Sequence, residues 1–161
     1  MFSFGKKTVI GLDIGSSQVK AVELEPHGSN FRLRGFGFAL LPPEAIVQGS
    51  FMNAPAISAA ISEACAMGGF KSKDVVTSVS GHSVIVKRIT LPAQSKEELE
   101  ESIRWEAEQY IPFDINGVNL DHQILRESGV DGQMDVLLVA AKKDLIDDYV
   151  SVITEAGLSL L

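Results

Sequence analysis

The residues best suited to chemistry in this sequence lie close together near its start: Asp13, Gly15, Ser16, Ser17 and Lys20. They fall between two apolar runs that predict a β-hairpin over residues 8–24. Small turn residues let backbone N–H groups converge on a phosphate oxygen, and the Lys20 ammonium adds positive charge. Asp13 could hold Mg²⁺ through the metal's water ligands. An ordinary serine-rich turn explains the same spacing, so both alternatives stay open.

Neither a GxxxxGK[ST] loop nor a GxGxxG fingerprint occurs in the sequence. The pattern Asp-x-Gly-x-x-x-x-Lys from Asp13 to Lys20 instead resembles the first phosphate loop of the actin, Hsp70 and sugar-kinase superfamily. That resemblance implies ATP and Mg²⁺ as cofactors, with Asp13 acting through the metal's hydration shell. It also implies that Gly15, Ser16, Ser17 and Lys20 hold the β- and γ-phosphates.

Composition limits the class of protein. The chain has 161 residues, 45% of them apolar, with 14 basic and 21 acidic residues and a formal charge of −7. Nucleic-acid binding through phosphate contacts is therefore not expected. No apolar run approaches the ~20 residues of a membrane span, and the single Cys65 excludes an internal disulfide. A cytoplasmic protein is expected, with any membrane association mediated by a protein partner and no direct insertion.

Turn and cap signals place further elements after the hairpin. Asn53 caps a predicted helix that ends before Gly68-Gly69, and Ser95 with Glu98 forms a capping box for a second helix that continues to about residue 110. The remaining predicted strands cover residues 31–38, 75–79, 84–91, 120–125 and 134–140, and a last helix covers residues 144–156. Residues 75–79 and 84–91 are expected to be neighbouring strands around Gly81-His82, with the domain boundary near residues 70–84.

Three later segments carry a more specific resemblance: Val84–Pro92, Arg104–Phe113 and Val136–Lys142. They resemble the PilM family of type IV pilus assembly proteins, relatives of FtsA in the actin-like superfamily. The implied fold class is α/β. Residues 1–74 would form an actin-like, ribonuclease-H-like subdomain 1A, and residues 75–161 an inserted strand-helix-strand-strand (SHS2-like) subdomain 1C with a return toward 1A.

PilM-like proteins run to about twice this length, so the resemblance implies an N-terminal fragment that lacks the second half of the actin-like fold. Such a chain would carry half of the nucleotide site and bind ATP weakly or not at all. At full length it would be at most a weak ATPase. No catalytic residue is assigned, because the acidic side chains of residues 95–110 fit a solvated helix face and His27, His82 and His122 have no second ligand at metal spacing.

A candidate partner site lies at the end of the second predicted helix. Trp105 falls off the apolar helix stripe, so it packs either on the rest of the protein or on a partner. Tyr110, Ile111, Pro112 and Phe113 form an apolar corner that either caps the local core or forms one wall of a groove. In PilM relatives such a groove takes the short N-terminal cytoplasmic tail of the bitopic membrane protein PilN.

The expected function is a cytoplasmic, ATP-binding actin-like adaptor of type IV pilus assembly, peripheral to the inner membrane through a PilN-like partner. Other pilus proteins or a second copy of the chain are further expected partners. Two alternatives remain. One is a phosphotransferase of the sugar-kinase branch, and the other is a peptide-binding module that works without nucleotide.

Overall fold

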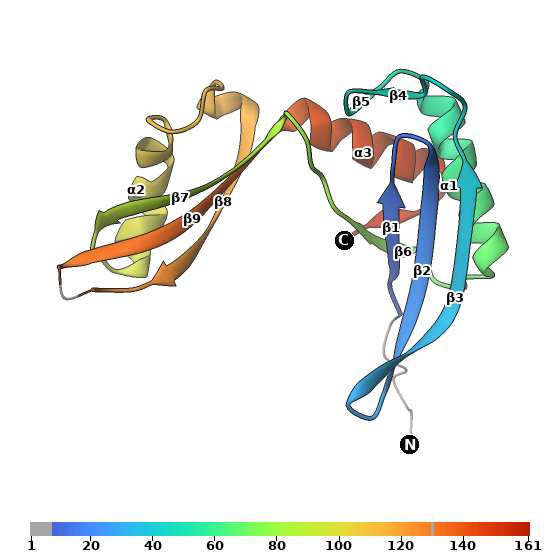
Figure 1. The fold of residues 1–161 in the computed structure, drawn as a ribbon, viewed down its shortest axis with the longest axis horizontal. Helices are drawn as coiled ribbons and strands as arrows, with labels where there is room; N and C mark the ends of the chain where they lie inside the picture. The colour runs from blue at the N-terminus through green and yellow to red at the C-terminus, as the bar shows by residue number, and fades with distance from the viewer. Residues whose placement is uncertain (1–7, 130) are drawn as a thin grey trace. The chain divides into compact units, whose positions relative to one another are not determined.

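The computed structural model describes residues 8–129 and 131–161, and the chain divides into two compact units (Figure 1). Unit 1 takes the chain up to Ser78 together with Asp147–Leu161, whereas unit 2 is the continuous segment Val79–Ile146. Unit 1 is therefore discontinuous in sequence.

A five-stranded mixed sheet forms unit 1. Its strands are β1 (Ile10–Ile14), β2 (Gln18–His27), β3 (Asn30–Leu40), β6 (Asp74–Thr77) and β10 (Ser159–Leu160), in the order β10-β6-β1-β2-β3. The first three strands are antiparallel, while β6 runs parallel to β1 and β10 parallel to β6. The short strands β4 (Ile46–Val47) and β5 (Ser50–Phe51) form a separate hairpin.

Helix α1 (Ala54–Gly68) covers one face of this sheet at close range. Asn53 caps its start by accepting the Ala56 N–H, and Gly69 ends it in the left-handed conformation. A Cβ added at Gly37 on β3 would overlap the carbonyl oxygen of Ala64, so only glycine permits this approach. Helix α3 (Lys143–Glu155) buries three further side chains, Tyr149, Val152 and Ile153. The core side chains of β1 and β2 alternate along each strand: Ile10, Leu12, Ile14, Val19 and Ala21.

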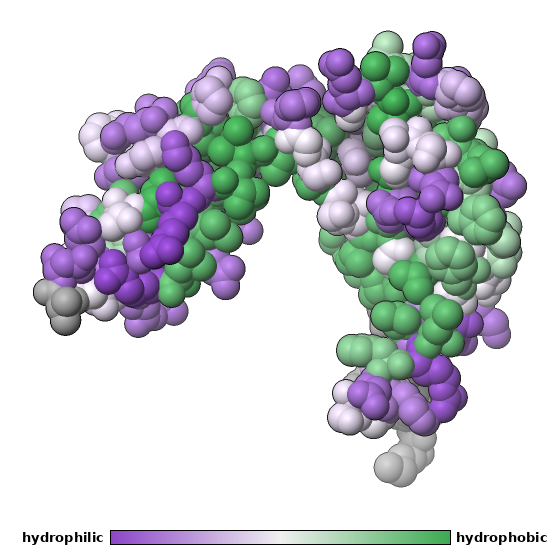
Figure 2. Space-filling view, viewed as in Figure 1, coloured by the Kyte–Doolittle hydropathy of each residue, from purple (hydrophilic) through white to green (hydrophobic). Residues whose placement is uncertain are grey.

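The opposite face of the same sheet is apolar and exposed. Phe36 and Phe38 on β3 are 49% and 40% exposed, and Leu40 is 72% exposed. Figure 2 shows hydrophobic side chains gathered on the visible side of unit 1, where β1, β2 and β3 face the viewer. Parallel strands are usually covered on both faces, so this surface is unusual for a sheet that contains them.

Unit 2 is a strand-helix-strand-strand unit, as expected. Strand β7 (Val84–Pro92) leads into helix α2 (Lys96–Ala107), a 3₁₀ turn η1 (Ile115–Gly117) and strands β8 (Val118–Arg126) and β9 (Gln133–Lys142). The sheet is antiparallel in the order β7-β9-β8. Helix α2 and the sheet share a core that includes Leu99, Ile103, Ala107, Val136 and Leu138. The Ser95–Glu98 capping box at the start of α2 is confirmed.

One strand pairing expected from the sequence is wrong. Residues 75–79 and 84–91 do form β6 and β7, but β6 pairs with β1 and β7 pairs with β9. The reason is that β6 buries Val75 against β1, a pairing between residues far apart in sequence. The division of the chain falls after Ser78, which lies inside the expected boundary region 70–84, and residues from Asp147 onward belong to unit 1.

Candidate functional site

Asp13 and Lys20 face each other across the β1–β2 hairpin. They are register partners in the antiparallel pair, and Lys20 Nζ donates to Asp13 Oδ2 at 2.9 Å. Both side chains are accessible, with 63% of Asp13 and 42% of Lys20 exposed. The structure therefore brings together the two charged residues that the sequence predicted as a phosphate and metal site. It also shows that each neutralises the other.

The turn between these strands offers fewer backbone donors than its sequence suggested. The Gly15 N–H is already used, since it donates to the Gln18 carbonyl at 3.0 Å. The Ser17 carbonyl accepts the Leu41 N–H at 2.9 Å, which fixes the turn against the end of β3. Ser16 and Ser17 are exposed, and in the described part of the chain neither their amides nor their hydroxyls donate a hydrogen bond. These two serines are the available donors.

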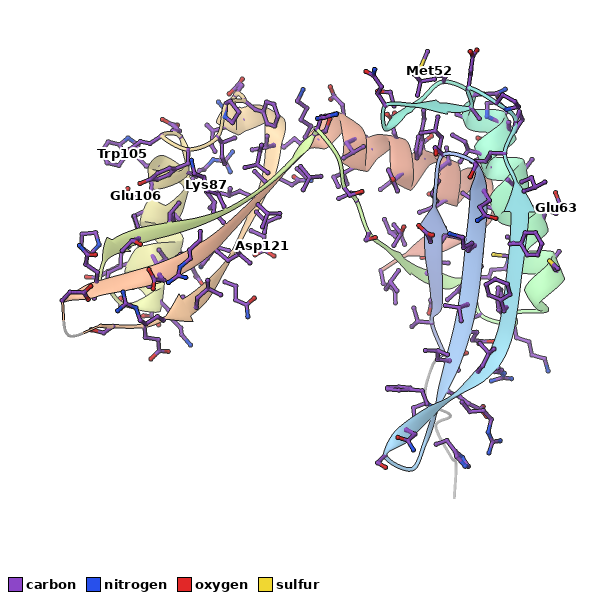
Figure 3. All side chains as sticks on the ribbon, viewed as in Figure 1. Met52, Glu63, Lys87, Trp105, Glu106 and Asp121 are labelled. Atoms are coloured by element: carbon purple, nitrogen blue, oxygen red, sulfur yellow. The ribbon has the colours of Figure 1, made fainter. Side chains whose placement is uncertain are left out.

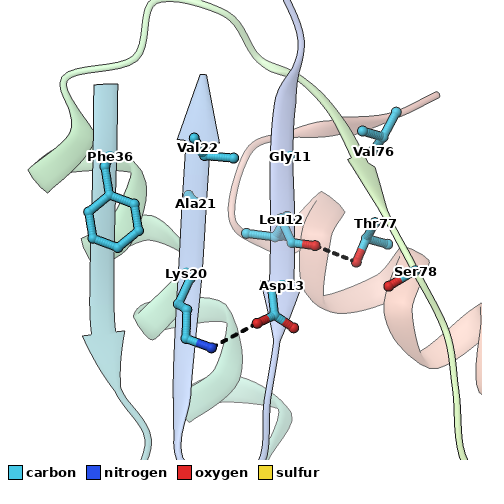
Figure 4. Close-up of a pocket in the computed structure, with 10 residues that line it drawn as sticks. All are labelled: Gly11, Leu12, Asp13, Lys20, Ala21, Val22, Phe36, Val76, Thr77 and Ser78. Carbon is cyan, nitrogen blue, oxygen red and sulfur yellow. Dashed lines mark hydrogen bonds and ion pairs between the residues drawn. The ribbon is translucent and has the colours of Figure 1, made fainter. Parts of the chain in front are cut away.

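Beside the ion pair, the exposed face of the sheet is hollowed into a pocket of about 520 Å³ (Figure 4). Asp13 and Lys20 are the charged residues of its lining. The uncharged lining residues come from β1, β2, β3 and β6 and the residue after β6: Gly11, Leu12, Ala21, Val22, Phe36, Val76, Thr77 and Ser78. Thr77 is fixed by its hydroxyl, which donates to the Leu12 carbonyl at 2.8 Å. The hollow therefore offers an apolar surface with one ion pair.

The donor set fits a phosphate group better than a free metal ion. One ammonium and two serines supply phosphate ligands if the Lys20–Asp13 contact opens. Among residues 8–129 and 131–161 there is no group of three or more His, Cys, Asp or Glu side chains that could hold a metal. Asp13 is a single carboxylate that could contact a phosphate-bound Mg²⁺ through water.

Tyr149 on α3 is electrostatically linked to this hairpin. Its ring packs against Phe51 with 4.8 Å between ring centroids. Burial raises the pKa of Tyr149, and the negative charge of Asp13 raises this pKa further. Unit 1 also contains Cys65, whose thiol pKa is raised by partial burial, which favours an inert thiol.

The apolar corner after α2 lies mostly inside unit 2. Ile111 is 6% exposed, and Tyr110 and Phe113 pack against the same core. Lysine ammonium groups lie over both rings, Lys87 at 5.1 Å from the Tyr110 centroid and Lys142 at 4.5 Å from that of Phe113. Pro112 is exposed. Three of the four predicted groove residues thus have a structural role as a cap over the local core.

Trp105 differs from this corner, because it is 69% exposed. Figure 3 shows its side chain pointing away from the strands of unit 2. Its neighbours one turn away on the helix surface, Glu101 and Glu108, are exposed and acidic. Within unit 2, Trp105 is available to a partner.

A charge network around one buried carboxylate in unit 2 was not predicted. Asp135 on β9 is 4% exposed and accepts hydrogen bonds from Arg88 at 2.8 Å, Thr90 at 2.9 Å and Arg126 at 2.9 Å. The hydrogen bonds from Arg88 and Thr90 are the main causes that lower the pKa of Asp135. A single Asp inside the apolar run 134–140 was the available sequence signal. The network ties β7 and β8 to the central strand.

No helix in the described residues is both long enough and apolar enough to cross a bilayer.

Comparison with known proteins gives consistent matches along the chain. The sequence profile of the family described as "Type IV pilus assembly protein PilM" matches residues 11–161. A solved "PilM-PilN type IV pilus biogenesis complex" contains a chain that is 31% identical, with a TM-score of 0.82 over 95% of the present chain and 46% of its own.

The cytoplasmic domain of EpsL, an inner membrane component of the type II secretion system of Vibrio cholerae, shares the fold at 11% identity. Its TM-score is 0.61 over 96% of the present chain and 55% of its own. The present chain thus spans about half the length of these two structures. The expected α/β fold class, with an inserted strand-helix-strand-strand unit, is confirmed. This chain belongs to the PilM family of type IV pilus assembly proteins.

Proposed function

We propose that the protein is an adaptor of type IV pilus assembly that holds the N-terminal cytoplasmic tail of a PilN-like bitopic membrane protein. The observation that carries this proposal is the 31% identity, over 95% of the chain, to a protein solved as a PilM-PilN complex. The adaptor would then be cytoplasmic and peripheral to the inner membrane through that partner. Trp105 and Pro112 are the exposed side chains of the predicted partner site, and the larger Trp105 is the better anchor for the tail.

The test is calorimetric titration of the full-length protein with a synthetic peptide of the PilN-like tail. Saturable binding is expected, and Trp105→Ala should weaken it by about 30-fold if Trp105 is an interface hot spot. Val86→Ala is the matched control, because Val86 is 61% exposed in the same unit. Absence of saturable binding to the unmodified protein would reject the adaptor function.

ATP with Mg²⁺ is the second part of the proposal. It is supported by the Asp13–Lys20 hairpin, the accessible serines and the apolar hollow beside them. Lys20→Ala should weaken ATP binding of the full-length protein about tenfold or more, since a charge-assisted hydrogen bond contributes ~1.5–3 kcal/mol. Lys71→Ala, which removes an exposed lysine elsewhere in unit 1, should leave the affinity unchanged.

A second candidate function is a peptide-binding module that works without nucleotide. The observation in its favour is that the Gly15 amide and the Lys20 ammonium already have partners within the hairpin. Under this function the tail binds with equal affinity in the presence and absence of Mg-ATP. Equal ATP affinity of the Lys20→Ala and unmodified proteins would favour it.

A further inference from the structure

The carboxyl ends of two parallel strands of unit 1 meet beside the hairpin that carries Asp13 and Lys20. Strand β6 pairs in parallel with β1 as far as Leu12 and Thr77. The next residues along the two strands are Asp13 and Ser78, so the same register places them side by side. In open α/β sheets, ligands bind outside the carboxyl ends of such strands. Ser78 therefore lies at the edge of the sheet where a ligand is expected.

Ser78, Asp13 and Lys20 form a polar row across this end of the sheet (Figure 4). Asp13 is the register partner of Lys20 and accepts a hydrogen bond from its ammonium at 2.9 Å. All three residues line the hollow on the exposed face of unit 1. The row thus combines one anion, one cation and one neutral hydroxyl group on a surface that a ligand can reach.

The place of Ser78 in the polar row is fixed by the preceding residue. The Thr77 hydroxyl donates to the Leu12 carbonyl at 2.8 Å, which holds the end of β6 against β1. Ser78 itself is exposed, and among the residues that the structure describes its hydroxyl has no hydrogen-bond partner. This hydroxyl group is therefore held in position by its backbone and is available to a ligand.

The row next to the polar row is apolar and contains a glycine. Gly11 lies between Val22 and Val76 in the strand register, and Phe36 continues this row on β3. A Cβ added at Gly11 would lie 3.2 Å from Val22 Cγ1, so glycine leaves the hollow open up to the polar row. Apolar surroundings keep water away from one side of the polar row, which strengthens the interactions of its charged groups.

The oxygen atoms of Ser78 and Asp13 suit the water shell of a phosphate-bound Mg²⁺. This ion keeps several of its waters when it binds to proteins, and those waters donate hydrogen bonds to carboxylate and hydroxyl oxygens. We propose that Ser78 is a positioning residue of the proposed Mg-ATP site, where its hydroxyl and the Asp13 carboxylate accept hydrogen bonds from water bound to the ion. This inference rests on the proposed nucleotide binding and adds a residue from outside the hairpin.

The first experiment measures ATP binding to the full-length protein by calorimetry, in Mg²⁺ and in EDTA. Ser78→Ala should weaken binding of Mg-ATP about fivefold, the effect of one hydrogen bond, and leave binding in EDTA unchanged. Ser78→Thr keeps the hydroxyl and should retain the affinity for Mg-ATP. Ser80→Ala removes an exposed serine that does not line the hollow and should change neither affinity.

The outcomes separate this inference from nucleotide binding itself. If Ser78→Ala loses no affinity, loses it equally in EDTA, or loses no more than Ser78→Thr does, the role of the Ser78 hydroxyl is overturned and nucleotide binding stands. If the unmodified protein binds no ATP in either medium, both the inference and the proposed nucleotide binding are rejected.

A double-mutant cycle tests whether Ser78 and Asp13 act on the same water shell. The combined loss of Mg-ATP affinity in Asp13→Asn with Ser78→Ala should be smaller than the product of the two separate losses. Lys20→Ala is the contrasting variant, because an ammonium bound to phosphate is lost in EDTA as well as in Mg²⁺. Independent effects of Asp13→Asn and Ser78→Ala would overturn the shared role.

Discussion

At the scale of single residues, the Asp13 carboxylate interacts with two side chains, Lys20 and Tyr149. It accepts a hydrogen bond from Lys20, and its charge contributes to the raised pKa of Tyr149. A phosphate that recruited Lys20 would leave Asp13 free to act on a metal hydration shell. In the proposed nucleotide site, this ion pair would have to open when the ligand binds.

Asp13→Asn is expected to lower the pKa of Tyr149 without returning it to its ordinary value. Burial remains the larger cause of the raised pKa after the carboxylate charge is removed. Ultraviolet titration of tyrosinate in a Tyr110→Phe background isolates Tyr149, since the chain has two tyrosines. Lys20→Ala should move the pKa in the opposite direction, because it leaves Asp13 unneutralised. An unchanged pKa in both variants would show that the hairpin charge does not reach α3.

Asp135→Asn is expected to lower the thermal stability of unit 2 more than Asp131→Asn does. Asp135 is buried and holds Arg88, Thr90 and Arg126, whereas half of the Asp131 side chain is exposed. The folded-state pKa of Asp135 is lowered, so its contribution is present at neutral pH and lost as pH falls through that lowered value. The stability difference between wild type and Asp135→Asn should shrink over that acidic range. A difference independent of pH would contradict this assignment.

At the scale of elements, the close packing of α1 on β3 depends on glycines of β3, which have no side chain. Gly35 and Gly37 lie under the helix, where an added Cβ would overlap its backbone. Gly37→Ala should reduce the free energy of unfolding by ~1–3 kcal/mol, the usual cost of overpacking. Gly117→Ala is the matched control, because no atom lies within 4 Å of its added Cβ and its φ is not positive. Chemical denaturation of the two variants compares them directly.

On the exposed apolar face of unit 1, we expect a substitution to leave the free energy of unfolding almost unchanged. Leu40 is 72% exposed on this face, while Ile61 of α1 is fully buried on the other. Leu40→Ser should change the free energy of unfolding by no more than ~0.5 kcal/mol and reduce binding of a hydrophobic dye. Ile61→Ser should be strongly destabilising. A large loss of stability from Leu40→Ser would mean that the face is covered.

Local sequence signals predicted the positions of helices and strands better than they predicted which strands pair. The hairpin, the Asn53 and Ser95 caps and the strand-helix-strand-strand order all follow from patterns within a few residues. The parallel pairing of β6 with β1 does not, because it depends on burial of Val75 by residues over 60 positions away. Strand β10 was also missed, because a strand of two residues carries no periodic signal.

The candidate site shows the same limit. The facing of Asp13 and Lys20 follows from hairpin register, which a turn signal predicts. The loss of the Gly15 amide to Gln18, the burial of Ile111 and the exposure of Trp105 depend on tertiary contacts. Glu100 of α2 and His122 of β8 line one pocket of unit 2 although they come from separate elements, and nothing in their spacing predicted this.

At the scale of the whole molecule, the two units differ in how the chain supplies them. Unit 2 is continuous from Val79 to Ile146 and has its own core. A polypeptide of these residues should unfold cooperatively by circular dichroism, as small antiparallel sheet-helix domains do. A chain that ends at Ile146 should keep this transition and lose that of unit 1, because it lacks most of α3 and all of β10. Loss of both transitions would show that unit 2 depends on unit 1.

The discontinuity of unit 1 also sets an order for biosynthesis. On the ribosome, β1, β2, β3, α1 and β6 emerge first, yet most of α3 and all of β10 arrive only after unit 2 has been translated. At ~5–20 residues per second, the 68 residues of unit 2 impose a delay of several seconds. During that interval β6 has no β10 beside it, and both the open sheet edge and the apolar surface beneath α3 are exposed to chaperones.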